Sequence, residues 1–178
     1  MKKINYFMLS MISIVICASF IIISCNTSED DTKAGEKTFE ETTPSSFIVG
    51  SNESSIVVSG AATVIAKVTV KLTILHQSTD DLELTIQSPV GTQVLLSDRN
   101  RGDSGDNYTD TVFDDSATTS IAAPSNISPF TGTFKPEQLL STFNGEDANG
   151  TWKLLIVDDG INGSAFRELS NWSLTISD

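Results

Sequence analysis

The sequence contains very little cysteine and histidine. Among its 178 residues are two cysteines, at positions 17 and 25, and a single histidine, His76. Zinc sites usually take three or four ligands from these two residue types, so the composition excludes the common zinc centres. A Ser-His-Asp mechanism would have to use His76, and the chain has no Gly-x-Ser-x-Gly segment. We therefore predict no catalytic residues in this chain.

Basic residues are also scarce. The whole chain has 11 lysines and arginines against 23 aspartates and glutamates. Once Lys2 and Lys3 are set aside with the N-terminal segment, nine basic residues remain and the formal charge is −14. Nucleic-acid binding relies on clustered Lys and Arg, so nucleic acid is excluded as a partner. Divalent cations or basic protein surfaces fit this charge better.

The N-terminus has the pattern of an export signal. Lys2 and Lys3 precede a stretch without charged residues from Ile4 to Ser24, as in the charged and apolar regions of a secretory signal. The stretch ends in Ile22-Ile23-Ser24-Cys25, which resembles the lipobox of bacterial lipoproteins. This resemblance implies that residues 1–24 are removed and that Cys25 carries lipid. The alternative is an uncleaved membrane helix, because about 20 apolar residues can cross a bilayer.

A polar segment follows Cys25. From residue 26 to about residue 45 the only large apolar residue is Phe39, which is too little to offset the entropy of ordering the chain. We predict a flexible acidic tether over residues 25–45. Within it, Ser28-Glu29-Asp30-Asp31 resembles the short signal that sends some lipoproteins to the outer face of the outer membrane, although a plain solvated linker has the same composition. The expected location is the outer membrane or the cell surface.

Alternating apolar and polar residues dominate from Phe47 onward. A period of two places successive side chains on opposite faces of a strand. This pattern predicts three half-buried strands, with the apolar residues Val64, Ala66, Val68, Val70, Leu72 and Ile74 in the first, Leu82, Leu84 and Ile86 in the second, and Trp172, Leu174 and Ile176 in the third.

The segment 152–157 (WKLLIV) is apolar on both faces at its end, as in a central strand. Turn signals such as Asn144-Gly145 and Asn162-Gly163 separate the segments, and only residues 136–140 have a short helical pattern beginning with proline. These features predict an all-β fold built as a two-sheet sandwich over residues 46–178. Trp152 and Trp172 are expected in its core.

Three motifs in this order resemble the P domain, or Homo B domain, of subtilisin-like proprotein convertases. They are His76 with 81–92 (DLELTIQSPVGT), then 143–154 (FNGEDANGTWKL) continuing to Asp158, then 169–176 (LSNWSLTI). The resemblance extends over residues 47–178. It implies a jelly-roll-like β-sandwich, which agrees with the strand pattern. It also implies an accessory role, because P domains support the folding of a separate catalytic domain.

Oxygen ligands remain available for a metal. Aspartates gather at the predicted strand ends and loops, where carboxylates can converge on calcium. Residues 98–110 are not an EF-hand, because glycine at the sixth position and glutamate at the twelfth are missing. The P-domain resemblance makes Ca²⁺ binding plausible at Asp81, Asp114, Asp115 and Asp158. The alternative is that these are solvated acidic loops.

Three functions are compatible with these sequence features. The first is a non-catalytic, membrane-tethered interaction module that docks on an extracytoplasmic protein, by family analogy an exported protease, through an open edge strand of the sandwich. The second is a calcium-dependent adhesion or glycan-binding module, for which Tyr108 is the one expected exposed aromatic platform. The third is a serine-type endopeptidase, the activity associated with the family, against which the missing triad argues.

Overall fold

The computed structural model describes residues 35–100, 106–126, 128–160 and 166–178, and these form a two-sheet sandwich. Ten strands are present: β1 (Glu36–Glu41), β2 (Ser45–Ser46), β3 (Gly50–Val58), β4 (Lys67–His76), β5 (Leu82–Gln87), β6 (Gln93–Asp98), β7 (Tyr108–Phe113), β8 (Phe130–Phe134), β9 (Gly150–Asp158) and β10 (Arg167–Ser177). Two 3₁₀ turns, η1 (Thr79–Asp81) and η2 (Leu140–Phe143), join them. No helix in these ranges is long and apolar enough to cross a membrane.

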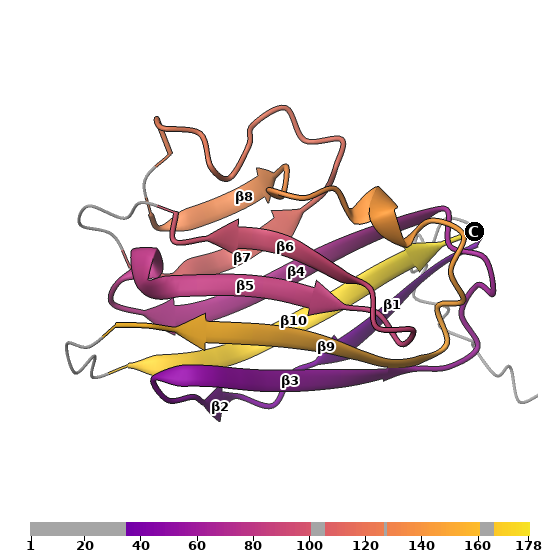
Figure 1. The fold of residues 1–178 in the computed structure, drawn as a ribbon, viewed down its shortest axis with the longest axis horizontal. Coiled ribbons are helices and arrows are strands. Elements are labelled where there is room, and N and C mark those ends of the chain that lie inside the picture. The colour runs from indigo at the N-terminus through magenta and orange to yellow at the C-terminus, as the bar shows by residue number, and fades with distance from the viewer. Residues whose placement is uncertain (1–34, 101–105, 127, 161–165) are drawn as a thin grey trace, which may run out of the picture. The chain divides into compact units, whose positions relative to one another are not determined.

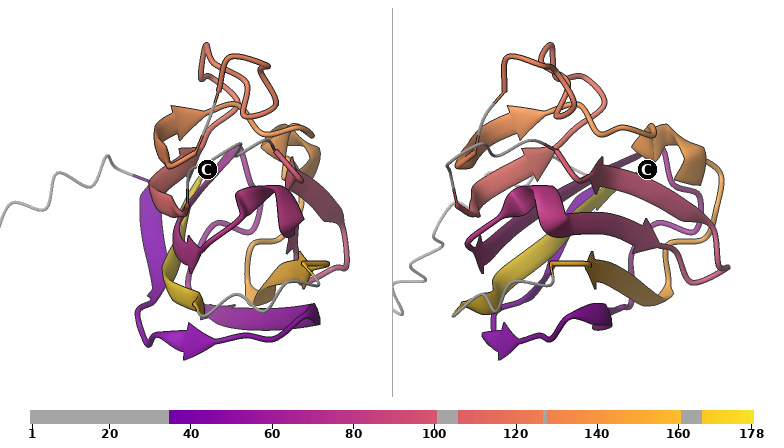
Figure 2. Two further views of the ribbon diagram at one scale, coloured as in Figure 1. Left: turned by 90° about the vertical axis from the view of Figure 1, so that its left-hand side faces the viewer. Right: turned by 60° about the vertical axis from the view of Figure 1, so that its left-hand side comes forward.

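The strands form two layers. One sheet has the order β1-β10-β4-β7-β8, with β2 also paired to β10, and the other has the order β3-β9-β5-β6. Figure 1 shows the second sheet in front of the first, and the left view of Figure 2 shows the two sheets facing each other. All pairings are antiparallel except β7 with β8, which is parallel. The predicted all-β sandwich is confirmed.

The alternating residues fill the space between the sheets. Val68, Val70, Leu72 and Ile74 from β4 are buried, as are the alternating residues of β5 and β10. Trp152 and Trp172 are 0% and 1% exposed, as expected of core residues. Each large aromatic side chain that is fully buried contributes on the order of 2 kcal/mol or more to folding.

Two local predictions were wrong. Val64 is 61% exposed and Ala66 is exposed as well, because β4 begins only at Lys67 and its inward face starts with Val68. Residues 136–140 form no helix, and the 3₁₀ turn η2 starts at Leu140 instead. The backbone N–H groups of Glu137 and Gln138 donate to carbonyl oxygens of β6, which gives them partners that a helix would not provide.

The tether prediction also needs correction. Residues 36–41 form β1, which pairs with β10 over six residues from Glu36 opposite Ser177 to Glu41 opposite Trp172. Phe39 packs against the core from this strand. Residues 36–41 are too polar to become ordered through burial of their own side chains, and the backbone pairing with β10 orders them instead. Residues 1–24, Cys25 and the rest of the tether up to residue 34 lie outside the described residues.

Candidate functional site

The one histidine lies at the end of β4, in a cluster of four side chains at one end of the sandwich. We call His76, Asp158, Arg167 and Phe47 the His76 cluster. His76 ends β4, Asp158 ends β9 and Arg167 begins β10, so antiparallel pairing brings them to the same end. Figure 1 shows this end on the left, beside the coil of η1.

Both ring nitrogens of His76 have partners. Its Nε2 lies 3.3 Å from Oδ2 of Asp158, and both side chains are 0% exposed. Because the partner is a carboxylate, Nε2 carries the proton and donates it. Nδ1 lies 2.7 Å from the carbonyl oxygen and 3.1 Å from the backbone nitrogen of Ser78. Whichever of these two bonds forms, the ring has no nitrogen left to take a proton from a substrate.

The backbone and ring face of His76 are held as well. Its N–H donates to Oδ1 of Asn107 at 2.9 Å, and its carbonyl oxygen accepts from the Asn107 N–H at 3.1 Å. The ring of Phe47 stacks on the imidazole with a centroid distance of 6.0 Å and an interplanar angle of 10°. These contacts fix the imidazole in one orientation.

Asp158 is the shared acceptor of the cluster. Arg167 Nε donates to its Oδ2, and the Gly160 N–H donates to its Oδ1 at 2.9 Å. Burial raises the pKa of Asp158, but the hydrogen bonds from Arg167 and Gly160 and the attraction to His76 and Arg167 outweigh it. The pKa therefore lies below its ordinary value and the carboxylate is ionised. A buried charge of this kind must be paired.

No hydroxyl is positioned as a nucleophile beside this histidine within the described ranges. The nearest serine in sequence, Ser78, donates its hydroxyl to Oδ1 of Asp80, and only its backbone faces the imidazole. The buried pair thus resembles the histidine and aspartate of a catalytic triad, but within the described residues no serine nucleophile accompanies it. Its geometry suits a structural bridge between the two sheets, because β4 and β9 belong to different sheets.

The four predicted calcium ligands lie at two distant places. Asp158 follows Val157 at the His76 end, and the Asp159 N–H donates to the Asp81 carbonyl oxygen at 3.1 Å, which places Asp81 there too. Asp114 follows Phe113, which pairs with Val70. Val70 precedes His76 by six positions, about 20 Å along the strand.

The side chains of the second pair are occupied. Lys67 donates to Oδ2 of Asp114 at 2.8 Å, and the Ser116 N–H donates to its Oδ1 at 2.8 Å. Burial raises the pKa of Asp114, yet these two partners hold the net value below its ordinary range. The two oxygens of Asp115 accept the N–H groups of Leu140 and Ser141, each at 2.8 Å.

Asp81 and Asp158 do approach each other across Gly160. A methyl group added at Gly160 would lie 2.4 Å from Oδ2 of Asp81 and 3.0 Å from Oδ1 of Asp158. Within the described ranges, no three or more Asp, Glu, His or Cys side chains are arranged to hold a metal ion. The four carboxylates are therefore not brought together, and calcium binding stays a prediction.

An arginine that no sequence motif indicated organises the neighbouring carboxylates. Arg99 Nε donates to Oδ2 of Asp159 at 2.7 Å, and its Nη1 donates to Oε2 of Glu83 at 3.1 Å and to Asp98. These hydrogen bonds raise the pKa of Arg99. Its backbone φ of 48° is unusual for a residue other than glycine. The sequence signal that could have indicated this role is an arginine directly after Asp98 in an aspartate-rich segment that also contains Arg101.

Tyr108 is buried, contrary to expectation. Its side chain is 0% exposed, its ring stacks on Phe130 at 5.1 Å, and its hydroxyl lies 2.9 Å from Oγ of Ser97. Burial raises the pKa of Tyr108. As the first residue of β7 it points between the sheets. It cannot serve as an exposed platform for a sugar ring.

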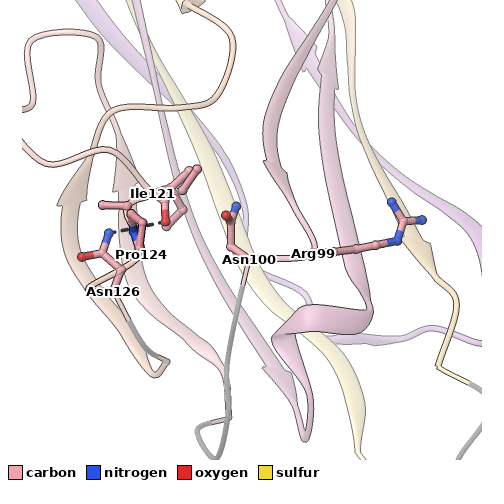
Figure 3. A pocket seen from close by; sticks show the side chains of 7 residues that line it. Arg99, Asn100, Ile121, Pro124 and Asn126 are labelled. Atoms are coloured by element: carbon pink, nitrogen blue, oxygen red, sulfur yellow. Dashed lines mark hydrogen bonds between the residues drawn. The ribbon is translucent and has the colours of Figure 1, made fainter.

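Two cavities of about 380 Å³ each open at the surface, one beside Arg99 and the other beside His76. One is lined by Arg99, Asn100, Ile121, Ala122, Ala123, Pro124 and Asn126. Figure 3 shows that the guanidinium of Arg99 points away from the 121–126 segment, whereas Asn126 is turned toward Ile121. The Asn126 side chain donates to the Ser120 carbonyl oxygen at 2.6 Å. The second cavity adjoins the His76 cluster and is lined by Leu75, His76, Gln77, Asp106, Asn107 and Phe166.

The sequence of the sandwich matches a known protein family. The profile of the proprotein convertase P-domain family matches residues 65–176, well over half of the chain. The chain belongs to this family. P domains are non-catalytic accessory domains of subtilisin-like proteases. The match begins just before β4 and ends within β10, so it includes the His76 cluster apart from Phe47.

Solved structures give a weaker likeness. The crystal structure of an Aeromonas sobria serine protease in complex with the chaperone ORF2 has a chain that aligns at 19% identity with a TM-score of 0.46, over 80% of this chain and 27% of that chain. The structure of the serine protease of Aeromonas sobria aligns at 16% identity with a TM-score of 0.44, over 79% and 27%. This P-domain protein spans about a quarter of those chains. No curated protein matches it.

Proposed function

We propose that this P-domain protein is a non-catalytic interaction module of the bacterial cell envelope that acts together with an exported subtilisin-like protease. The observation that carries the proposal is the state of His76. The only histidine of the chain is buried and both of its ring nitrogens are engaged, by Asp158 and by the Ser78 backbone. A chain whose single candidate base is fixed in this way is better suited to binding than to hydrolysis.

Membrane attachment is the second part of the proposal. Cys25 is the proposed lipid site, and residues 26–34 with the acidic Ser28–Asp31 stretch would connect it to the sandwich. The expected location is the outer membrane or the cell surface. Metabolic labelling with a radioactive fatty acid tests this directly, with Cys25→Ser as the variant that should lose the label. Labelling of the variant equal to that of the wild type would overturn lipidation at this position.

The partner is tested by capture from intact cells. Tagged full-length protein is cross-linked mildly, purified and analysed by mass spectrometry. The proposal expects an exported protease of the subtilisin type among the enriched proteins, and expects it to be absent when a tagged unrelated lipoprotein is used. Enrichment of glycan-bearing surface components instead would favour the adhesion alternative. Tyr108, the aromatic platform expected for sugar binding in that alternative, is buried.

The endopeptidase alternative has its own test. Purified protein is incubated with a peptide mixture, and His76→Gln is compared with the wild type after both are shown to be folded. We expect no hydrolysis from either. Hydrolysis that is present in the wild type and lost in a folded His76→Gln variant would contradict the non-catalytic proposal.

Calcium remains a proposed ligand, with Asp81 and Asp158 at the Gly160 loop as the pair of predicted ligands from separate segments that approach each other. A site filled to 100 times its dissociation constant would add about 2.7 kcal/mol to the free energy of unfolding. Identical melting curves in millimolar calcium and in chelator would remove calcium from the account.

A further inference from the structure

Among the described residues, the two sheets of the sandwich have four edges, formed by β1 with the two-residue β2 and by β8 in one sheet, and by β3 and β6 in the other. An edge strand presents unpaired backbone N–H and C=O groups to any extended chain nearby. Proteins usually protect such edges with charged residues, glycine or proline kinks, bulges or a covering segment. The four edges of this sandwich differ sharply in how far they are protected.

The edge of β6 is covered by the chain itself. The N–H groups of Glu137 and Gln138 donate to the carbonyl oxygens of Leu96 and Leu95 at 3.2 and 2.9 Å. The side-chain oxygens of the same two residues accept the N–H groups of Asp98 and Leu95 at 2.7 and 3.0 Å. Two residues thus occupy the hydrogen-bonding groups that a further strand would need.

The other sheet has two interrupted or charged edges. Four of the six residues of β1 are charged, in the sequence EKTFEE. In β8, Gly132 has a φ of 104°, and the register with β7 shifts between Thr109 and Thr111. Ser120 forms an isolated bridge with Lys135 just beyond β8. Each of these features hinders the addition of a regular strand.

Strand β3 has fewer of these protections, although its first residue, Gly50, has a φ of 103° and β1 of the other sheet lies near it. It pairs with β9 over nine residues without a register shift, and within the described residues no second strand pairs with it. Figure 1 shows it along the lower border of the front sheet, with the short β2 below it in this view. The sequence of β3, GSNESSIVV, has no proline and one charged residue. That residue, Glu53, is neutralised by Lys153 at 3.1 Å.

Exposed apolar side chains stand at both ends of this edge. Ile48 and Val49 are 72% and 48% exposed just before β3, and Val57 is 72% exposed near its end. The turn before the strand is fixed by Asn52, whose Oδ1 accepts the Ile48 N–H at 3.1 Å and whose Nδ2 donates to the Gly50 carbonyl oxygen at 3.0 Å. The apolar groups are therefore presented from an ordered backbone.

We propose that β3 is a docking edge that takes an extended, net-basic segment of a partner protein as an added strand. Main-chain hydrogen bonds to β3 would supply affinity, and contacts with Val49 and Val57 would set the register. The charge of the occupant follows from the chain, whose 23 acidic residues outnumber its 11 basic ones. A second copy would bring the same acidic surface to the edge and be repelled.

This inference deepens the proposed function and rests on it, since it says how the partner is held. It is tested without the partner, using the purified full chain and synthetic eight-residue peptides of alternating valine and lysine. Peptides with glutamate in place of lysine are the charge control. Hydrogen exchange of residues 50–58 is measured with and without peptide, and exchange of 93–98 on the covered β6 edge is the internal reference.

The expected result is slower exchange in 50–58 with the lysine peptide and no change in 93–98. Loss of the valine contact in Val57→Lys should weaken peptide binding about tenfold, because burying one such side chain contributes roughly 1.5 kcal/mol. Val90→Lys is the matched control, since Val90 is 65% exposed in the turn between β5 and β6, which β9 separates from β3, and it should bind as the wild type.

Unchanged exchange in 50–58, equal protection by the glutamate peptide, or a concentration-dependent dimer that protects β3 would each overturn the inference. Failure of the proposed function would look different. In that case the lysine peptide would still protect 50–58, while capture from intact cells would recover no exported protease.

Discussion

Nε2 of His76 lies 3.3 Å from Oδ2 of Asp158, with both side chains fully buried and each on a different sheet of the sandwich. His76 is the last residue of β4 and Asp158 is the last residue of β9, so the pair links the two sheets at one end of the sandwich. Arg167 completes the charge balance. This arrangement connects the sheets and leaves the histidine without a free nitrogen.

Asp158→Asn should destabilise the protein strongly. The change removes the charged partner of the buried His76 and the ionised acceptor of the Arg167 Nε, and removing one member of a buried pair costs about 3 kcal/mol. Chemical denaturation of the wild type and the variant measures the difference. Asp110→Asn is a matched control, because Asp110 pairs with Lys71 at the surface and should cost well under about 1 kcal/mol.

Asp158 also makes the free energy of unfolding depend on pH in the acid range. The folded pKa of Asp158 lies below its ordinary value, so its stabilisation is fully present above the unfolded pKa of about 3.9 and is lost as the pH falls through the folded pKa. The wild type should therefore lose stability below about pH 4 more steeply than Asp158→Asn. Parallel pH profiles of the two proteins would contradict this assignment.

Tyr108 offers a spectroscopic test of the core. It is the only tyrosine after residue 24, so tyrosinate absorbance of the chain from Cys25 onward reports this residue alone. Because its folded pKa is raised, ionisation favours the unfolded state once the pH exceeds the unfolded pKa of about 10. Tyrosinate should appear together with the loss of the near-ultraviolet signal of Trp152 and Trp172. Tyrosinate formed in a still folded protein would show that Tyr108 is not buried.

The turn before β9 depends on glycine at position 150. Gly150 has a φ of 135°, and a methyl group there would lie 2.7 Å from Cβ of Pro89. Gly150→Ala should cost about 2–5 kcal/mol, from backbone strain and the overlap together. Gly145 has a φ of 89° with open space around it, so Gly145→Ala should cost only about 1 kcal/mol. Equal melting temperatures for both variants would contradict the role of the Pro89 contact.

The sequence predicted those parts of the fold in which each strand carries its own alternating pattern. Strands β4, β5 and β10 were predicted from their apolar residues, and so was the burial of Trp152 and Trp172. Strand β1 was missed because its sequence is charged and polar and its stability comes from pairing with β10, a contact that local composition does not encode. The P-domain motifs pointed to the correct family.

The candidate site was harder to predict. Strand register decides whether the four predicted calcium ligands, Asp81, Asp114, Asp115 and Asp158, converge. The observed register places Asp114 near the start of β4, whereas Asp158 lies near its end. The roles of Arg99 and Arg167 depend on contacts between segments distant in sequence. Tyr108 was expected to be exposed because acidic residues surround it in sequence, yet its position at the start of β7 directs it inward.

The measurement that tests the central claim most directly is capture of the full-length protein from intact cells, with Val57→Lys and Val90→Lys compared with the wild type. We predict that an exported subtilisin-like protease is recovered with the wild type and with Val90→Lys, and that its recovery falls about tenfold with Val57→Lys. Recovery of no exported protease with the wild type would contradict the account.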